Sequence, residues 1–230
     1  MQHPLIKHLR SEMMARRDPA RAEPMAAYMK NIQPFLGIAS PVREDIIKSA
    51  RKVYAIESRD IYRDIIFELW NGEFREEKYM ALEVAQRYKP YLNSDSFDIY
   101  EKLVYDADWW DTLDWLAGKI VGPIVQKHRG FENNLIQWRT AENLWTRRAA
   151  LLTHLKHKKH TNIKLLSETI ELLAPETDFF IRKAIGWVLR EYSKTDSQWV
   201  INFVKSHEKT LSNLSKREAL KVVERQKDEK

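Results

Sequence analysis

The sequence contains no cysteine, only 6 glycines among 230 residues, and no long apolar run. The absence of cysteine excludes disulfides, a thiolate zinc site and a cysteine nucleophile, and it is compatible with a reducing compartment. The scarcity of glycine favours long helices over a turn-rich β protein. Because no stretch of about 18 apolar residues occurs and the N-terminus lacks an apolar signal segment, we expect a soluble, cytoplasmic protein that does not use a membrane.

Positive charge is in moderate excess, with 39 Lys and Arg against 33 Asp and Glu, a net charge of +6 and a pI near 9.3. Its placement is more informative than its amount. No acidic residue lies between Glu142 and Glu168, whereas this interval holds Arg147, Arg148, Lys156, Lys158, Lys159 and Lys164. A solvated surface normally mixes charges of both signs, so the run favours a polyanionic partner over a plain exposed basic surface.

The same interval contains His154, His157 and His160, spaced three residues apart. Positions i, i+3 and i+6 drift around a helix, no carboxylate is near in sequence, and the neighbouring lysines would repel a cation. We therefore expect no metal site here. The sequence also lacks a glycine-rich phosphate loop and the common hydrolase and protease motifs, so we expect no cofactor.

Helical periodicity extends along the whole chain, and no segment shows a sustained alternation typical of a strand. Prolines and capping residues mark the helix starts. Ser215 and Glu218 have the spacing of a capping box, and Gly118, Gly122 and Pro123 follow the central helix. The expected helices begin at Pro4, Pro19, Ser40-Pro41, Ser58, Phe74, Ser94 or Ser96 and Asp108, and then cover residues 131–138, 142–157, 163–174, 178–192, 196–207 and 215–226.

A repeat appears when the second half is compared with itself at a shift of 35 residues. The pairs Trp109-Trp110, Leu144-Trp145 and Phe179-Phe180 then coincide, as do Asp114, Ala149, Ala184 and Ala219. A helix-pair unit of this length is typical of an α-solenoid, in which each unit buries its apolar face on the next. We predict an all-α superhelix of helical repeats that forms a single domain over residues 1–230. An acid at a position that is otherwise alanine is easier to explain by function than by stability.

Around that acid, Asp108 is expected to cap a helix and Asp111 to complete a capping box. Trp110 and Asp114 are four residues apart, so both project from one face of the helix. An aromatic surface beside a carboxylate suits a cationic, electron-poor group. The alternative is a solvated aspartate next to a tryptophan of the core.

Arg148 precedes Ala149 in the following repeat, so stacked helices would place its guanidinium about 8–10 Å from the Asp114 position, a distance that arginine can span. Arg147 lies beside it, and spacing alone does not choose between the two. One repeat further, Lys183 and Trp187 share a helical face. Taken alone, Trp187 fits the core better than a site.

These motifs together resemble the AlkD family of bacterial DNA alkylation-repair glycosylases. The similarity covers nearly the whole chain, and only the 157–177 region and the last few residues are without it. The residues that carry it are Trp109-Trp110-Asp111-Thr112-Leu113-Asp114, Asn143-Leu144-Trp145, Arg148-Ala149-Ala150, Phe179-Phe180-Ile181, residues 183–192, Ala22-Glu23-Pro24-Met25, Tyr28-Met29-Lys30-Asn31, Phe35-Leu36-Gly37-Ile38, Glu68-Leu69-Trp70 and residues 214–219.

The resemblance implies HEAT-like repeats with a concave basic groove for duplex DNA, in a monomer that works at the bacterial nucleoid. It implies hydrolysis of the N-glycosidic bond of N3- and N7-alkylated purines, such as 3-methyladenine and 7-methylguanine, with the base left in the stack. The implied catalytic residues are Trp110, Asp114, Arg148 and Trp187. Further contacts with DNA are expected from Tyr28, Trp109, Arg147, Lys156, Lys158, Lys159, Lys183 and Arg190.

The residues are compatible with this chemistry. An alkylated purine is cationic and already a good leaving group, so a fixed carboxylate that stabilises the oxocarbenium-like sugar is the main requirement. Asp114 is the candidate, and it could also position the attacking water. The competing interpretation is a non-catalytic helical-repeat adaptor that binds DNA or protein, which fold alone does not exclude.

Overall fold

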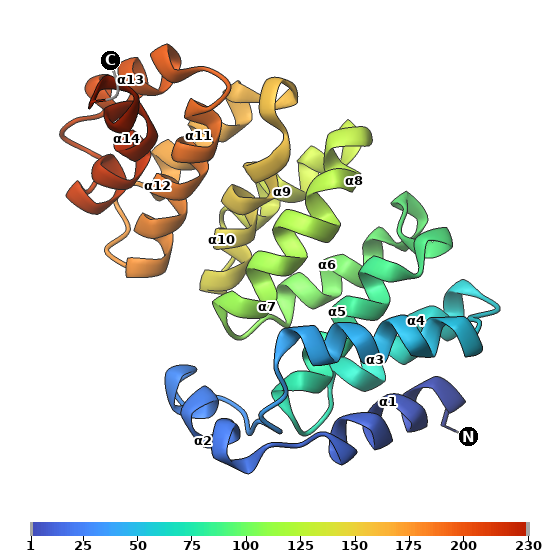
Figure 1. Cartoon of the computed structure of the whole chain (residues 1–230). Helices are drawn as coiled ribbons and strands as arrows, with labels where there is room; N and C mark the ends of the chain where they lie inside the picture. The colour runs from blue at the N-terminus through green and yellow to red at the C-terminus, as the bar shows by residue number, and fades with distance from the viewer. Residues whose placement is uncertain (1, 229–230) are drawn as a thin grey trace. The chain divides into compact units, whose positions relative to one another are not determined.

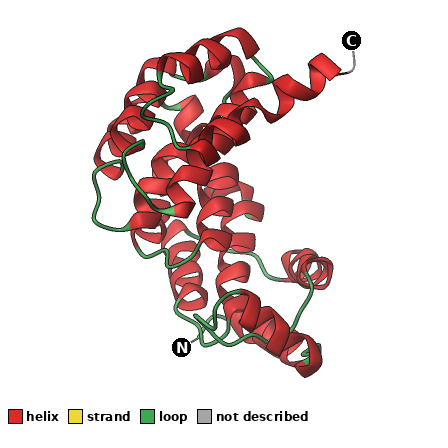
Figure 2. Ribbon diagram, turned by 90° about the vertical axis from the view of Figure 1, so that its left-hand side faces the viewer, coloured by secondary structure: helices red, strands yellow, loops and turns green. Residues whose placement is uncertain are grey.

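The computed structural model describes residues 2–228, with side chains through residue 223. Within these residues the chain consists of helices and connecting loops, without a strand (Figures 1 and 2). The all-α fold of helical repeats predicted from the sequence is therefore confirmed. No described helix combines the length and the apolar character that spanning a membrane requires.

The helices group into two compact units, residues 1–99 and 100–230. The first unit contains α1 (Pro4–Ala15), α2 (Pro19–Tyr28), α3 (Ser40–Val53), α4 (Arg59–Trp70), α5 (Arg75–Arg87) and short 3-10 turns at Lys89–Tyr91 and Ser94–Ser96. α6 (Phe97–Tyr105) begins where this unit ends. The second unit continues with α7 (Trp110–Trp115), α8 (Gly122–Lys127), α9 (Glu132–Trp138), α10 (Leu144–Leu152), α11 (Ile163–Leu173), α12 (Phe179–Ser193), α13 (Ser197–Ser206) and α14 (Asn213–Asp228). The expected single domain stays a prediction.

The helix starts of the first unit follow the signals in the sequence. Pro4 opens α1, which buries Leu5, Ile6, Leu9 and Met13. The Ser58 side chain accepts a hydrogen bond of 3.2 Å from the backbone N–H of Ile61 at the start of α4. The expected cap of α3 was wrong by one residue. Ser40 is already helical, Ala39 occupies the N-cap position, and no side chain caps this end.

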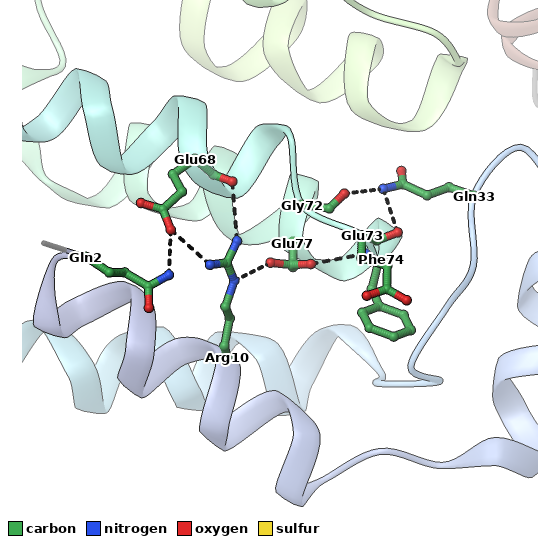
Figure 3. Close-up of polar contacts among 8 residues, drawn as sticks. All are labelled: Gln2, Arg10, Gln33, Glu68, Gly72, Glu73, Phe74 and Glu77. Atoms are coloured by element: carbon green, nitrogen blue, oxygen red, sulfur yellow. Dashed lines mark hydrogen bonds and ion pairs between the residues drawn. The ribbon is translucent and has the colours of Figure 1, made fainter.

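Charged contacts connect α1 to the corner between α4 and α5 (Figure 3). The Arg10 guanidinium donates to Glu77 at 2.6 Å and to Glu68 at 2.9 Å. Glu77 also accepts a bond of 3.1 Å from the backbone N–H of Phe74, and Gln33 donates to the carbonyl of Gly72 at 2.9 Å. These contacts fix the turn that precedes α5.

The neighbouring residue Glu76 is fully buried and holds the loop between α2 and α3. Its carboxylate accepts hydrogen bonds from the backbone N–H groups of Leu36, Gly37 and Ile38, at 2.9, 2.9 and 3.0 Å. Gly37 has φ +85°, and a Cβ there would lie 2.1 Å from the carbonyl oxygen of Asp18. The tight loop therefore requires glycine. The loop follows α2, a helix in which no residue is buried.

The second unit shows the expected repeat. Its helices α7, α10, α12 and α14 begin at Trp110, Leu144, Phe179 and Asn213, about 35 residues apart. Ala149, Ala184 and Ala219 are completely buried on the last three of these helices. Asp114 takes the equivalent position on α7, so the register read from the sequence is present in the structure.

The helix after Asp114 does not stop at Gly118, as the sequence suggested. α7 passes through one π-helical segment (Leu116–Val121) into α8, and all three form one continuous helix. At Gly122 a Cβ would lie 2.8 Å from the carbonyl oxygen of Thr153. Glycine here permits close packing of consecutive repeats and does not break the helix. π-helical turns often occur near functional sites.

The predicted capping box at Ser215 was also wrong. α14 begins two residues earlier, and Ser215 donates its hydroxyl to the carbonyl of Arg182 on α12 at 2.8 Å. Glu218 does not reach back to the helix start, because it pairs with cations of α12 and α14. α12 and α14 pack closely at Gly186, where a Cβ would lie 2.5 Å from the Cβ of Glu218.

Candidate functional site

The central feature of the second unit is an ion pair between α7 and α10. The Nε and Nη2 atoms of Arg148 donate to the two carboxylate oxygens of Asp114, each at 2.8 Å. The Nη1 atom of the same guanidinium donates to the carbonyl oxygen of Phe180 on α12. Arg148 thus joins three successive repeats and holds the carboxylate in one orientation.

The pair lies at the edge of the buried interior. The Arg148 side chain is 4% exposed and that of Asp114 is 15% exposed, so the carboxylate keeps limited access to solvent. Burial raises the pKa of Asp114 above its usual value, the hydrogen bond and charge of Arg148 oppose this rise, and the charge of Asp111 adds to it. A carboxylate with a raised pKa is a better proton acceptor than an exposed one.

An aromatic cluster lies beside the ion pair. The ring centroids of Trp109, Trp145 and Phe180 are 4.9 to 5.5 Å apart, in tilted or edge-to-face arrangements. The three rings come from the starts of α7, α10 and α12. Trp145 and Phe180 coincide in the 35-residue repeat, and Trp109 lies one position before the residue that coincides with them. Trp109 was expected to contact DNA, and the structure places it in this cluster, with its indole nitrogen buried.

The other two expected catalytic residues are aromatic. Trp110 is the first residue of α7, and Trp187 lies in the middle of α12; both side chains are half-buried. Trp187 follows Phe180 by seven residues, or two helical turns, and therefore shares its face of α12. Both tryptophans keep part of their surface accessible to a ligand.

The expected cap of the central helix was wrong. Trp109, not Asp108, occupies the N-cap position of α7, and no side chain caps this end. Thr112 instead donates its hydroxyl to the carbonyl of Trp109 at 3.3 Å. Asp111 does lie in the first turn, where negative charge is favourable.

Several cations expected to contact DNA form ion pairs with glutamates of the protein itself. Arg147 forms two hydrogen bonds of 2.8 and 3.0 Å with Glu176 and also donates to two backbone carbonyls. Lys183 and Arg190 pair with the buried Glu218 at 2.9 and 2.5 Å. These pairs settle which of the two neighbouring arginines contacts Asp114, since Arg147 turns to Glu176.

The remaining expected DNA contacts are exposed. Lys156, Lys158 and Lys159 lie in the turn after α10, and Tyr28, at the end of α2 in the first unit, is 73% exposed. The described part of the chain forms no group of three His, Asp or Glu side chains arranged for a metal ion.

His154 and His157 are not on the surface. Both are buried, with ring centroids 5.3 Å apart. Burial, with smaller contributions from the charges of His157 and Arg129, lowers the pKa of His154 to about 3. His157 is hydrogen-bonded through Nε2 to the carbonyl oxygen of Gly122 at 2.8 Å. The pair is therefore a neutral part of the packing between α8 and α10.

The partners of these side chains have no local signal in the sequence. Glu176 and Glu218 lie about 30 residues along the chain from the cations they bind. Arg148 also binds the backbone carbonyl of Phe180, and a backbone acceptor cannot be recognised from residue types. Trp145 and Phe180 were visible only as members of the repeat. The shift of 35 residues was the one signal that could have brought them next to Trp109.

Comparison with known proteins agrees with this fold. The family model described as "DNA alkylation repair enzyme" matches residues 9–223. The chain therefore belongs to the DNA alkylation repair enzyme family. A solved structure from Enterococcus faecalis, described as a predicted DNA alkylation repair enzyme, is 33% identical in sequence with a TM-score of 0.81, over 89% of this chain and 95% of that one. No curated protein matches the chain significantly.

Family membership establishes a role in the repair of alkylated DNA, with DNA as the substrate. The resemblance stated from the sequence is thereby confirmed at this level.

Proposed function

We propose that this protein is a monofunctional DNA glycosylase that releases N3- and N7-alkylated purines from duplex DNA. The observation that carries the proposal is the Asp114–Arg148 pair, a carboxylate fixed by two hydrogen bonds of 2.8 Å beside aromatic side chains. An acid in place of a buried alanine of the repeat lowers the stability of the fold, so its presence at this position favours a functional role.

The chemistry needs little more than this carboxylate. When the bond between C1′ and the purine nitrogen breaks, the electron pair moves to the base and neutralises its positive charge. Positive charge then develops on the sugar, and the oxygens of Asp114 stabilise it. Water adds to C1′ and gives a proton to Asp114, whose raised pKa suits it to accept one.

Arg148 acts on the carboxylate in this scheme. Three of its N–H groups bind protein acceptors, and its side chain is 4% exposed, so its main task is to orient Asp114. Contact with a flanking phosphate would use the remaining N–H groups. Trp110 and Trp187 would pack against the deoxyribose of the damaged nucleotide and exclude water from the bond that breaks.

The composition favours base release over transfer of the alkyl group to a cysteine of the protein. A protein that accepts an alkyl group on sulfur needs a cysteine thiolate, and these 230 residues contain none. Base release requires only a positioned water and the carboxylate.

The test uses duplex DNA carrying 7-methylguanine with a labelled methyl group. A glycosylase releases the label as free methylated base and leaves an abasic site. Label recovered on the protein or as a one-carbon product, with guanine left in the strand, would show a different repair chemistry. No change in the DNA would favour the non-catalytic adaptor.

A further inference from the structure

The side chain of Asn143 connects the two helices that carry the ion pair. Asn143 lies immediately before α10, and its Oδ1 atom accepts a hydrogen bond of 2.8 Å from the backbone N–H of Trp145, which caps that helix. Its Nδ2 atom donates to the carbonyls of Tyr105 and Ala107, at 3.0 and 3.2 Å. These two carbonyls lie at the end of α6 and in the connection to α7. One amide therefore links the start of α10 to the segment that leads into α7.

A second side chain in the first turn of α10 adds to this link. The buried Thr146 donates its hydroxyl to the carbonyl of Val104 at 3.3 Å. The last carbonyls of a helix have no partner within the helix itself. The first turn of α10 thus binds the end of α6, and this contact fixes the place from which the chain continues into α7.

The amide of Asn143 does more than a helix cap requires. At the equivalent position of the next repeat, 35 residues later, Asp178 caps α12 by accepting hydrogen bonds from the backbone N–H groups of Phe180 and Ile181. An ionised carboxylate only accepts hydrogen bonds, whereas an asparagine amide has an acceptor oxygen and two donor hydrogens. Because Asn143 uses both its oxygen and its nitrogen, its donors serve the contact between helices and not the cap.

This link lies close to the Asp114–Arg148 pair. Arg148 follows Asn143 by five residues, a rise of about 7 Å along α10, and Asp114 follows Ala107 by seven residues. Both carboxylate oxygens of Asp114 are hydrogen-bonded at 2.8 Å, and a paired geometry of this kind is lost when its groups move by more than about 0.5 Å. A small shift of α7 relative to α10 would therefore lengthen at least one of these bonds.

We propose that Asn143 is a positioning residue of the site, whose two amide hydrogen bonds hold α7 and α10 at the separation that pairs Asp114 with Arg148. Asn143 acts through the ion pair and has no contact with the reacting sugar in this scheme. Its effect on catalysis rests on the proposed glycosylase function, whereas its effect on the ion pair does not.

The experiment uses two variants of Asn143. Asn143→Asp keeps the acceptor that caps α10 and loses both donors, and Asn143→Ala loses acceptor and donors without adding charge. The matched control is Asn162→Asp. Asn162 caps α11 by accepting from the backbone N–H of Leu165 at 3.1 Å, and it donates to Glu132 on α9 at 2.7 Å. The same exchange there removes a contact between α9 and α11 and leaves the link between α7 and α10 intact.

The first readout is the pKa of Asp114 in the protein without DNA. It is measured by NMR titration of ¹³C-labelled aspartate carboxyls, and the Asp114 signal is assigned by its loss in Asp114→Asn. The charges of Arg148 on α10 and of Asp111 on α7 act on this carboxyl, and Arg148 opposes the rise in pKa that burial causes. A looser pair opposes this rise less, so the pKa should increase by about one in both variants of Asn143 and stay unchanged in the control.

An unchanged pKa of Asp114 in both variants, or an equal increase in the control, would overturn the proposal. Asn143→Ala carries no new charge, so an increase shared with Asn143→Asp arises from the looser pair and not from a nearby carboxylate. A purely structural role of Asn143 would lower the melting temperature and leave this pKa where it is in the wild type.

The second readout is the single-turnover rate of base release at neutral pH, corrected for the folded fraction. It should fall about 10- to 100-fold in both variants of Asn143, with the affinity of Asn143→Ala for undamaged duplex unchanged, and it should stay near the wild-type rate in the control. Absence of release by the wild type would reject the glycosylase, and the pKa comparison would still test the role of Asn143. Normal release with an unchanged pKa would reject the positioning role alone.

Discussion

Arg148 and Asp114 face each other across α7 and α10 with both carboxylate oxygens hydrogen-bonded at 2.8 Å. The first prediction concerns the pH dependence that this pair imposes. Burial raises the pKa of Asp114 and Arg148 counteracts the rise, so removing the arginine leaves the rise unopposed. In the variant Arg148→Met, base release should be slow at neutral pH and should recover partly as the pH increases.

The acid limb of the rate profile of Arg148→Met should lie at higher pH than that of the wild type. Arg148→Lys keeps the charge but not the paired geometry, and its acid limb should fall between the two. Single-turnover rates from pH 5 to pH 9 provide the measurement. Identical acid limbs in all three proteins would show that Arg148 does not control the ionisation of Asp114.

Trp187 should contribute to base release more than to folding. Its half-buried ring lies on the face of α12 that carries Phe180, and truncation to alanine removes packing worth about 1–3 kcal/mol, or roughly 5- to 150-fold in rate. Trp199→Ala on α13, which removes a ring stacked at 4.9 Å on Phe203, is the matched control. Equal rates for the two variants, both corrected for folded fraction, would argue against a role for Trp187 in the site.

Glu218 should stabilise the C-terminal helix pair at neutral pH. Although burial alone would raise its pKa, hydrogen bonds from Lys221 and Lys183 and the charges of Lys183 and Arg190 lower it to about 2. Because the pKa is lower in the folded state, this stabilisation is complete above pH 4.5 and is lost as the pH falls towards 2.

Glu218→Gln should therefore unfold more easily by about 2 kcal/mol at pH 7, and the difference from the wild type should shrink in acid. Urea denaturation at several pH values gives the comparison. A difference that stays constant down to pH 2.5 would mean that the carboxylate charge is not the stabilising factor.

His154 should make the fold sensitive to acid in a different pH range. Burial lowers its pKa from 6.5 to about 3, so the unfolded chain takes up a proton at pH values where the folded protein does not. Folding stability is then lost between pH 6.5 and pH 3, with a slope of about 1.4 kcal/mol per pH unit from this residue.

Both ring nitrogens of His154 lack a hydrogen-bond partner, so His154→Leu should be neutral or stabilising at pH 7 and should flatten the acid slope. His128→Leu changes an exposed histidine and serves as the control. If His154→Leu kept the full wild-type slope between pH 6 and pH 4, the neutral buried imidazole would not be its source.

Much of the fold could be predicted because its signals are local. Proline at position 4 and serine at position 58 mark helix starts, and the 35-residue register placed Asp114 in line with Ala149. That register and the length of an arginine side chain placed Arg147 and Arg148 within reach of Asp114, and the structure shows that Arg148 makes the contact while Arg147 binds Glu176.

The features that could not be predicted depend on contacts between residues far apart in the sequence. The helix continues through Gly118 and Gly122, and at Gly122 it packs closely against Thr153 of the next repeat. Likewise, the pairing of Lys183 and Arg190 with Glu218 depends on how α14 packs on α12, which periodicity does not encode. Cations that look alike in the sequence thus divide into those paired with glutamates, such as Arg147, Lys183 and Arg190, and those that stay exposed.

The most direct test of the account is release of 7-methylguanine from methylated duplex DNA by Asp114→Asn, with Asp111→Asn on the same helix as the control. The asparagine keeps the size of the side chain but cannot stabilise positive charge on the sugar, so release should fall about 100- to 1,000-fold while the melting temperature and the affinity for undamaged duplex stay near those of the wild type. Asp111→Asn should remain active at neutral pH. Release by Asp114→Asn at the wild-type rate would contradict the central claim that this carboxylate drives the reaction.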